Sequence, residues 1–225
     1  MDREKVAGDE EYALRQDIIG ACLSLERQGV NQGVSGNISA RWKDGLLITP
    51  SGVAYDQMKP ADIVYMTMDG AADHRLPPSS EWRFHRDILR NRPDAGAVVH
   101  AHPTYCTAFA MCGMEIPAAH YMIAVAGGPT IRCSRYESYG STELSDAVLE
   151  ALEGRTCALL GNHGMVAIGA DLTRAMWRAV EVETLAKQYA VALQIGTPRL
   201  LASEEIQKTV EKFKTYGPRR GIETT

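Results

Sequence analysis

Two histidines two residues apart, His100 and His102, directly follow an apolar and β-branched run. Side chains at positions i and i+2 of a strand point to the same face, so both imidazoles can reach one point in space. Neutral imidazole is the commonest metal ligand in proteins. Pro103 suits the start of a helix, where no N–H donor is needed. This stretch predicts a metal-binding strand end that leads into a helix.

Two further segments carry compatible chemistry. A second apolar strand is followed by His163, and a predicted helix begins near Glu81, behind Ser79 and Ser80. Three protein nitrogens with a carboxylate or an open position form the ligand set of a catalytic zinc ion. We therefore predict one metal site gathered from separate elements: Glu81, His100, His102 and His163.

The other three histidines have weaker signals. His85 lies one helical turn after Glu81 and offers an alternative metal pair, but we expect it to pack against its neighbours or orient them. His74 and His120 have no partner pattern and are predicted to be structural.

Composition limits the class of protein. The chain has 225 residues, 45% of them hydrophobic, which is enough to bury a full core as one domain. A net charge of −4 without a basic run argues against nucleic-acid binding. Five cysteines without a C-x-x-C pair predict free thiols in a reducing compartment. With no signal peptide and no apolar run of roughly 20 residues, we expect a cytoplasmic protein without membrane contact.

Hydrophobic periodicity and turn signals predict interleaved helices and strands. Helices are expected at about 11–28, 80–90, 103–112, 141–154, 171–195 and 203–216. Strands are expected at about 37–42, 46–49, 63–68, 97–101, 131–134, 157–160 and 165–168. Without repeats, linkers or low-complexity segments, the pattern indicates a single α/β domain over residues 1–225.

Taken in order, seven motifs resemble those of the class II aldolase/epimerase family. They are SGNIS at 35–39, LITPSG at 47–52, SSEWRFH at 79–85, HAH at 100–102, HYMIA at 120–124, NHG at 162–164 and EKFKTYG at 211–217. The resemblance covers a core of about residues 10–217. It implies a central, mostly antiparallel β-sheet flanked by helices. It also implies a homotetramer with active sites at subunit interfaces.

The resemblance implies zinc-dependent, reversible retro-aldol cleavage of a ketose 1-phosphate. L-fuculose 1-phosphate is the first candidate, with dihydroxyacetone phosphate and L-lactaldehyde as products of a zinc-stabilised enediolate route. His100, His102 and His163 would hold zinc or another divalent metal. Glu81 would be a ligand that departs when substrate binds and then moves a proton. Tyr121 would reach in from a neighbouring subunit and protonate the alkoxide of the aldehyde half.

Two substrate pockets follow from the same resemblance. Small residues with backbone N–H groups and short hydroxyl donors would bind the phosphate: Gly36, Asn37, Ser51, Gly52, Ser79 and Ser80. The aldehyde pocket would comprise Tyr139, Phe213 and Tyr216. Tyr139 stands where a similar family member has a phenylalanine, so its hydroxyl can change which aldehyde the pocket accepts.

Other functions stay open at this point. The substrate can be another deoxy-pentulose or deoxy-hexulose 1-phosphate. Sugar-phosphate 4-epimerases resemble the chain but carry an aspartate where Glu81 stands, which argues against epimerisation. A methylthioribulose-phosphate dehydratase keeps a glutamate and is harder to exclude. A non-enzymatic adaptor on this fold would be expected to lack the metal histidines, and all three are present.

Overall fold

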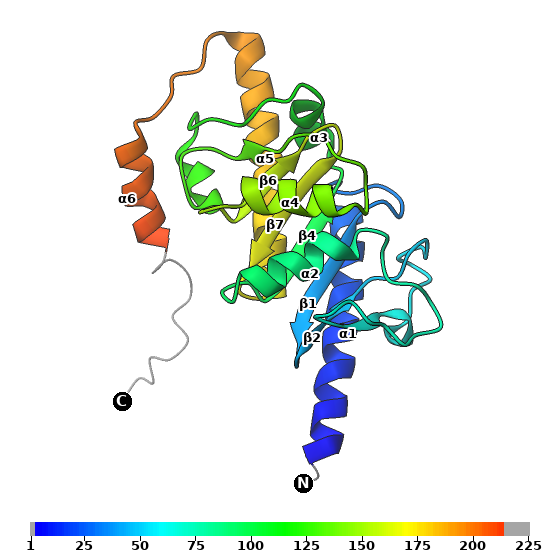
Figure 1. The fold of residues 1–225 in the computed structure, drawn as a ribbon. Coiled ribbons are helices and arrows are strands. Elements are labelled where there is room, and N and C mark those ends of the chain that lie inside the picture. Colours follow the sequence, from blue (N-terminus) through cyan, green and yellow to red (C-terminus); the bar gives the residue numbers. More distant parts are fainter. Residues whose placement is uncertain (1–2, 214–225) are drawn as a thin grey trace, which may run out of the picture.

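The computed structural model describes residues 3–213, and its centre is one seven-stranded sheet (Figure 1). The strands are β1 (Asn37–Trp42), β2 (Gly45–Ile48), β3 (Val64–Thr67), β4 (Ala97–Ala101), β5 (Arg132–Cys133), β6 (Cys157–Leu160) and β7 (Gly164–Gly169). They are ordered β3-β2-β1-β4-β7-β6-β5, and only the β5–β6 pair is parallel. The predicted fold class, α/β with a mostly antiparallel sheet, is confirmed.

Helices cover both faces of this sheet. They are α1 (Arg3–Arg27), α2 (Trp82–Asn91), α3 (Thr104–Met111), α4 (Thr142–Ala151), α5 (Leu172–Ile195) and α6 (Ser203–Phe213), with short 3-10 helices η1 (Pro60–Asp62) and η2 (Tyr121–Ala126). In Figure 1, α2 and α4 lie on one side of the sheet, while α1 and α5 lie on the other. The result is a three-layer arrangement.

The first helix is longer than the sequence pattern predicts. It begins at Arg3 instead of near residue 11. Its buried face is formed by Ile18, Cys22 and Leu25, whereas residues 8–10 are exposed. Periodicity reports only a buried stripe, so the exposed residues 8–10 give no signal.

The second helix starts later than predicted. Ser79 to Glu81 form a turn, in which the Trp82 N–H donates to the Ser79 carbonyl oxygen at 3.0 Å, and regular helix follows from Trp82. The last helix is described to Phe213. Tyr216 and the rest of the predicted helix to residue 216 lie outside the described residues.

Each face of the sheet has its own apolar core. On β4, Val98 belongs to the cluster under α2 and α4, and Val99 belongs to the cluster under α1, α3 and α5. This alternation follows from the two-residue period of a strand. It also places the His100 side chain on the α2 side, where its ring meets Phe84 edge-on with centroids 5.4 Å apart.

The sheet register brings three chain segments to one edge. β4 is central and antiparallel to both neighbours, so Asn37 at the start of β1 lies opposite His100. On the other side of β4, Ala101 pairs with Met165, the second residue of β7, and His163 lies in the turn that directly precedes this strand. Asn37, His100 and His163, which are separated by 63 to 126 residues in sequence, therefore meet at the end of β4.

The cysteines are unpaired, as the sequence predicts. All five cysteines are free thiols, and three of them are buried. Burial raises the pKa of Cys22 and of Cys157 to about 12, so both thiols stay protonated at neutral pH.

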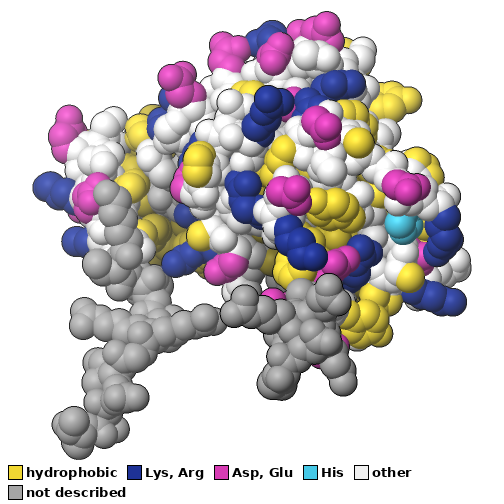
Figure 2. Space-filling view, turned by 60° about the horizontal axis from the view of Figure 1, so that its bottom comes forward, with side chains coloured by type: hydrophobic (Ala, Val, Ile, Leu, Met, Phe, Trp, Pro, Cys, Tyr) yellow, Lys and Arg dark blue, Asp and Glu magenta, His cyan; other side chains and the backbone are white. Residues whose placement is uncertain are grey.

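On the face shown in Figure 2, Lys and Arg side chains are interspersed with Asp and Glu. Within residues 3–213 no helix combines the length and hydrophobicity that a membrane span requires.

Glu183 of α5 anchors the helix that follows the metal-binding strand. Its two carboxylate oxygens accept the backbone N–H groups of Tyr105 and Cys106, each at 2.9 Å, in the first turn of α3. Pro103, the N-cap residue, offers no side-chain acceptor.

We expect Glu183→Ala to lower the free energy of unfolding by about 2 kcal/mol, because two charge-assisted hydrogen bonds at a helix N-terminus are lost. Glu183→Gln should lose less, since the amide retains one acceptor oxygen. Urea denaturation of the three proteins measures the difference. Equal stability of Glu183→Ala and wild type would show that solvent replaces the cap.

Candidate metal centre and active site

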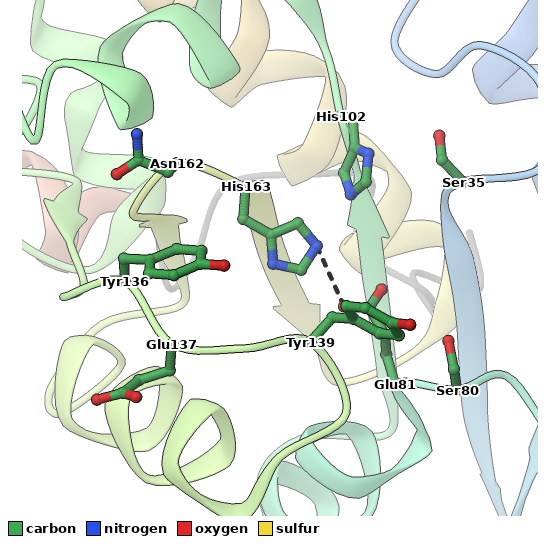
Figure 3. A pocket seen from close by; sticks show the side chains of 9 residues that line it. All are labelled: Ser35, Ser80, Glu81, His102, Tyr136, Glu137, Tyr139, Asn162 and His163. Atoms are coloured by element: carbon green, nitrogen blue, oxygen red, sulfur yellow. Dashed lines mark ion pairs between the residues drawn. The ribbon is translucent and has the colours of Figure 1, made fainter.

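Four side chains converge at the end of β4. One ligand atom from each of Glu81, His100, His102 and His163 lies within 4.8 Å of every other. The Nε2 atoms of His100 and His102 are 2.9 Å apart, and the two rings face the third imidazole with centroids 4.8 Å away. Figure 3 shows the ion pair between His163 and Glu81 at this centre, with His102 beside it. The predicted metal-site residues are thus brought together.

The tautomer of His100 is fixed by a backbone contact. Its Nδ1 lies 2.8 Å from the Met165 carbonyl oxygen, which can only accept a hydrogen bond. Nδ1 therefore carries the proton, and a neutral His100 presents a bare lone pair on Nε2 toward the centre. Second-shell hydrogen bonds of this kind orient metal-ligating histidines.

Glu81 is buried and ionised at the same centre. Oε2 lies 3.0 Å from His100 Nε2, and Oε1 lies 3.1 Å from His163 Nε2. Burial by itself raises the pKa of the carboxyl, but His100 and His163 outweigh it and hold the pKa well below its usual range. Burial also lowers the pKa of His100, but the Glu81 carboxylate raises it by more, so the pKa of His100 lies above its ordinary value. The centre therefore favours positive charge beside the carboxylate.

The donor set fits a divalent metal. Glu81 Oε1 is buried, and its contact with His163 lacks hydrogen-bond geometry, so it has no hydrogen-bond partner among the described residues. A buried carboxylate oxygen without a partner is costly. Burial, His100 and His163 together lower the pKa of His102 to about 3, which leaves that imidazole neutral and able to ligate. A cation within this ring of donors would satisfy both features.

Two close backbone approaches hold the histidines in place. The His102 N–H donates to Asn31 Oδ1 at 3.2 Å. Gly164 lies so close to the neighbouring strand that a Cβ there would stand 2.5 Å from the Ala101 carbonyl oxygen and 2.6 Å from His102 Cδ2. Glycine is therefore required after His163, because any side chain would push the β6–β7 turn away from β4.

A pocket of about 340 Å³ opens onto the metal centre, which is within the usual size range of small-molecule sites. Its lining residues are Ser35, Ser80, Glu81, His102, Tyr136, Glu137, Tyr139, Asn162 and His163. In Figure 3 the Tyr136 hydroxyl points toward His163, while the Glu137 carboxylate points away from the histidines. Tyr136 and Glu137 were not predicted, because they belong to a loop without periodicity or a metal-ligand pattern.

The three predicted phosphate segments lie side by side. Thr49 exchanges hydrogen bonds with Ile38, and its carbonyl oxygen accepts the Ser79 N–H at 2.9 Å. The Ser51 N–H donates to Pro77, so two of the expected free amides are already used. The backbone N–H groups of Gly36, Gly52 and Ser80 have no hydrogen-bond partner among the described residues. Unpaired amides of this kind can bind an anion.

The remaining predicted residues lie apart from this cluster. Tyr139 lines the pocket and is 74% exposed. Tyr121, on η2, is 52% exposed and is not among the lining residues that the described part of the chain contributes. Phe213 is half-buried against the core under α5. The ring nitrogens of His74 contact the carbonyl oxygens of Leu76 and of Ala61 in η1, and His120 accepts the Met122 N–H.

Comparison with known proteins identifies the family. The family model described as "Class II Aldolase and Adducin N-terminal domain" matches residues 16–190. The chain belongs to the class II aldolase family. The chain is 50% identical over 205 residues to a 5-methylthioribulose-1-phosphate/5-deoxyribulose-1-phosphate aldolase of Rhodospirillum rubrum, covering 91% of this chain and 93% of that protein. It is 46% identical over 220 residues to the L-fuculose phosphate aldolase of Escherichia coli K12, covering 97% and 99%.

A solved structure supports the same assignment. An L-fuculose 1-phosphate aldolase superposes with a TM-score of 0.87 at 39% identity, covering 89% of this chain and 95% of the other. This class II aldolase is therefore a metal-dependent enzyme, and its cluster of three histidines and one glutamate is suited to hold the metal.

Proposed function

We propose that this class II aldolase cleaves a deoxy-ketose 1-phosphate to dihydroxyacetone phosphate and a small aldehyde. The observation that carries the proposal is the convergence of three imidazole nitrogens and one buried carboxylate at the floor of a substrate-sized pocket. Three nitrogens and one carboxylate suit zinc, so we propose zinc as the metal. When bound, the metal polarises the substrate carbonyl and offsets the negative charge that develops on its oxygen.

The protein groups then supply proton transfer. Retro-aldol cleavage breaks the C3–C4 bond: the 4-hydroxyl loses its proton, the bonding electrons move to C3, and C3 takes up a proton. Glu81 is proposed to deliver the proton to C3, because its Oε1 is buried at the centre without a hydrogen-bond partner. Tyr121 of a neighbouring subunit is proposed to receive the proton of the 4-hydroxyl.

Phosphate binding is assigned to the adjoining segments. Gly36, Gly52 and Ser80 offer unpaired backbone amides, and the side chains of Ser51 and Ser79 lie in the adjoining segments. The side-chain amide of Asn37, which the sequence also predicts at the phosphate, is buried and donates to Glu81 Oε2 instead. These groups bind an anion without a lysine or arginine, because oriented amides carry the partial positive charge. They would fix the phosphate end of the ketose while its carbonyl faces the metal.

We extend the proposal to the assembly. The half-exposed Tyr121 contributes no lining to the pocket of its own chain within residues 3–213. A homotetramer with active sites at subunit interfaces would bring Tyr121 to a neighbour's pocket. Sedimentation velocity of the purified protein tests this part, and a monomer with full activity would contradict it.

Two substrate classes are favoured by the relatives. The R. rubrum protein is named for 5-methylthioribulose 1-phosphate and 5-deoxyribulose 1-phosphate, and the E. coli K12 protein is named for L-fuculose phosphate. All are ketoses whose far end lacks a hydroxyl. Cleavage of L-fuculose 1-phosphate would give L-lactaldehyde, and cleavage of the methylthio sugar would give 2-(methylthio)acetaldehyde.

The deciding experiment measures dihydroxyacetone phosphate release by coupled reduction. The substrates are L-fuculose 1-phosphate, 5-methylthioribulose 1-phosphate, 5-deoxyribulose 1-phosphate and ribulose 5-phosphate, each with and without a chelator. We expect chelator-sensitive release from at least one ketose 1-phosphate. No release from any of them by zinc-containing protein would overturn the aldolase assignment of this site and favour dehydration or epimerisation instead.

Tyr139→Phe should change the preference among these substrates. Tyr139 lines the pocket. Its hydroxyl is proposed to face the aldehyde half of the substrate, and among the aldehyde products only L-lactaldehyde offers a hydroxyl to pair with it. We expect kcat/KM for L-fuculose 1-phosphate to fall about tenfold relative to that for the methylthio sugar, which corresponds to about 1 kcal/mol. Tyr65→Phe, far from the pocket, is the control and should leave the ratio unchanged. An unchanged ratio in Tyr139→Phe would remove that residue from the aldehyde pocket.

A further inference from the structure

We propose that His85 is a positioning residue for Glu81 and acts through the amide of Asn37. This inference rests on the proposed proton transfer by Glu81. Four buried polar side chains form a continuous hydrogen-bonded series, which we call the His85 network: Ser39, His85, Asn37 and Glu81. Its links are Ser39 Oγ to His85 Nδ1 at 2.8 Å, His85 Nε2 to Asn37 Oδ1 at 2.5 Å, and Asn37 Nδ2 to Glu81 Oε2 at 3.0 Å.

The sheet and one helix build this network. Asn37 and Ser39 are two residues apart on β1, so their side chains share the face that α2 covers. His85 belongs to the buried face of α2 and stacks on Phe84. Its ring therefore reaches both β1 side chains, one with each nitrogen. His85 is fully buried, as is Ser39, and Asn37 and Glu81 are 5% exposed.

The direction of every hydrogen bond is determined by the carboxylate. An ionised carboxylate can only accept, so Asn37 must turn its NH₂ group toward Glu81. Its carbonyl oxygen then faces His85 and accepts a hydrogen bond from the Nε2–H group. Nδ1 is left bare and accepts the Ser39 hydroxyl. Burial lowers the pKa of His85 to about 3, which agrees with a neutral ring carrying one proton.

The network separates the two oxygens of Glu81. Oε2 is held by Asn37, whereas Oε1 has no hydrogen-bond partner among the described residues. A carboxylate that must leave a metal and then carry a proton needs one fixed oxygen and one available oxygen. His85 supplies this by preventing the Asn37 amide from rotating, because a rotated amide would place its own oxygen against Oε2. Among the described residues, His85 belongs neither to the pocket lining nor to the ligand cluster, so it positions Glu81 through Asn37 and is not itself a ligand.

The test uses two substitutions that are matched in chemistry. In His85→Gln the side-chain nitrogen reaches about as far as Nε2 and can donate to Asn37. In His85→Asn the shorter amide reaches only the Nδ1 position. Both proteins are compared with wild type as full-length, zinc-loaded enzymes, and zinc content is measured by atomic absorption. Proton transfer is measured without C–C cleavage, as loss of the NMR signal at the hydroxymethyl carbon of dihydroxyacetone phosphate in D₂O.

We expect zinc content to be equal in all three proteins. His85→Asn should slow both deuterium exchange and kcat about 10- to 100-fold, with KM changed by less than about threefold, while His85→Gln should recover most of the rate. Ser145→Ala is the control for packing, because it removes a partly buried 2.7 Å hydrogen bond from Ser145 Oγ on α4 to Asp87 on α2, the helix that carries His85. It should lower stability and leave exchange unchanged.

If a variant does not fold, the tautomer of His85 can still be measured in the wild-type protein. The ¹⁵N shifts of the wild-type His85 ring should show a proton on Nε2 and none on Nδ1; the opposite tautomer would overturn the inference. Equal exchange rates of the Gln and Asn variants, beside an active wild type, would overturn the inference alone. A zinc-loaded wild type that neither exchanges nor cleaves would overturn the proposed function, and the inference with it.

Discussion

His100→Ala is expected to lose both the metal and the activity. The substitution removes the central donor, whose Nε2 lies 2.9 Å from that of His102 and 3.0 Å from the Glu81 carboxylate. It also removes the favourable charge partner of a buried carboxylate, which no other group on β4 replaces. Metal polarisation of a carbonyl is worth several kcal/mol, and each 1.36 kcal/mol is a factor of ten in rate, so we expect a loss of about a thousandfold or more.

The measurement pairs zinc content with cleavage rate. Atomic absorption of dialysed protein gives zinc per chain, and the coupled assay gives kcat. His74→Ala is the matched control, because the ring of His74 contacts the backbone carbonyl oxygens of Leu76 and Ala61 and is not part of the ligand cluster, so this variant should keep both properties. A zinc-loaded and active His100→Ala protein would show that the metal centre lies elsewhere.

Glu81→Gln is expected to separate metal binding from catalysis. The three histidine Nε2 atoms remain, so zinc should be retained, whereas the amide cannot carry a proton between substrate and solvent. General acid–base catalysis contributes about 10²- to 10⁴-fold, and we expect kcat to fall within that range. Deuterium exchange into dihydroxyacetone phosphate should fall by the same factor.

Asp62→Asn is the control for Glu81→Gln. Asp62 is a second buried carboxylate, which accepts the Lys59 N–H at 2.8 Å in the cap of η1. Its amide variant should lose stability, since the amide is a weaker acceptor, but should keep its turnover. Full turnover of Glu81→Gln would assign the proton transfer to another group.

Local sequence determined the elements that carry the site. The i, i+2 spacing of His100 and His102 on a β-branched strand fixes their common direction, because a strand alternates its side chains with a period of two. Strand β4 was predicted with its observed bounds, 97–101, and so was β6 at 157–160. Hydrophobic periodicity failed where no surface is buried, as at the exposed residues 8–10 of α1.

The family motifs predicted which residues belong together, and the sheet register explains how they meet. Asn37 lies opposite His100, and Met165 lies beside Ala101, only because β4 is placed between β1 and β7. Strand order depends on packing between segments far apart in sequence, which local patterns do not encode. For the same reason the loop residues Tyr136 and Glu137 gave no signal, although both line the pocket.

The role of His85 shows this division most clearly. From the sequence, His85 is a histidine one turn after Glu81, with either a metal or a packing role. Only the tertiary structure decided that its two nitrogens face Ser39 and Asn37, since that depends on α2 lying across the start of β1. The sequence by itself determined the ligand types and their local directions. The packing of α2 on the sheet decided which oxygen of Glu81 is held and which is available.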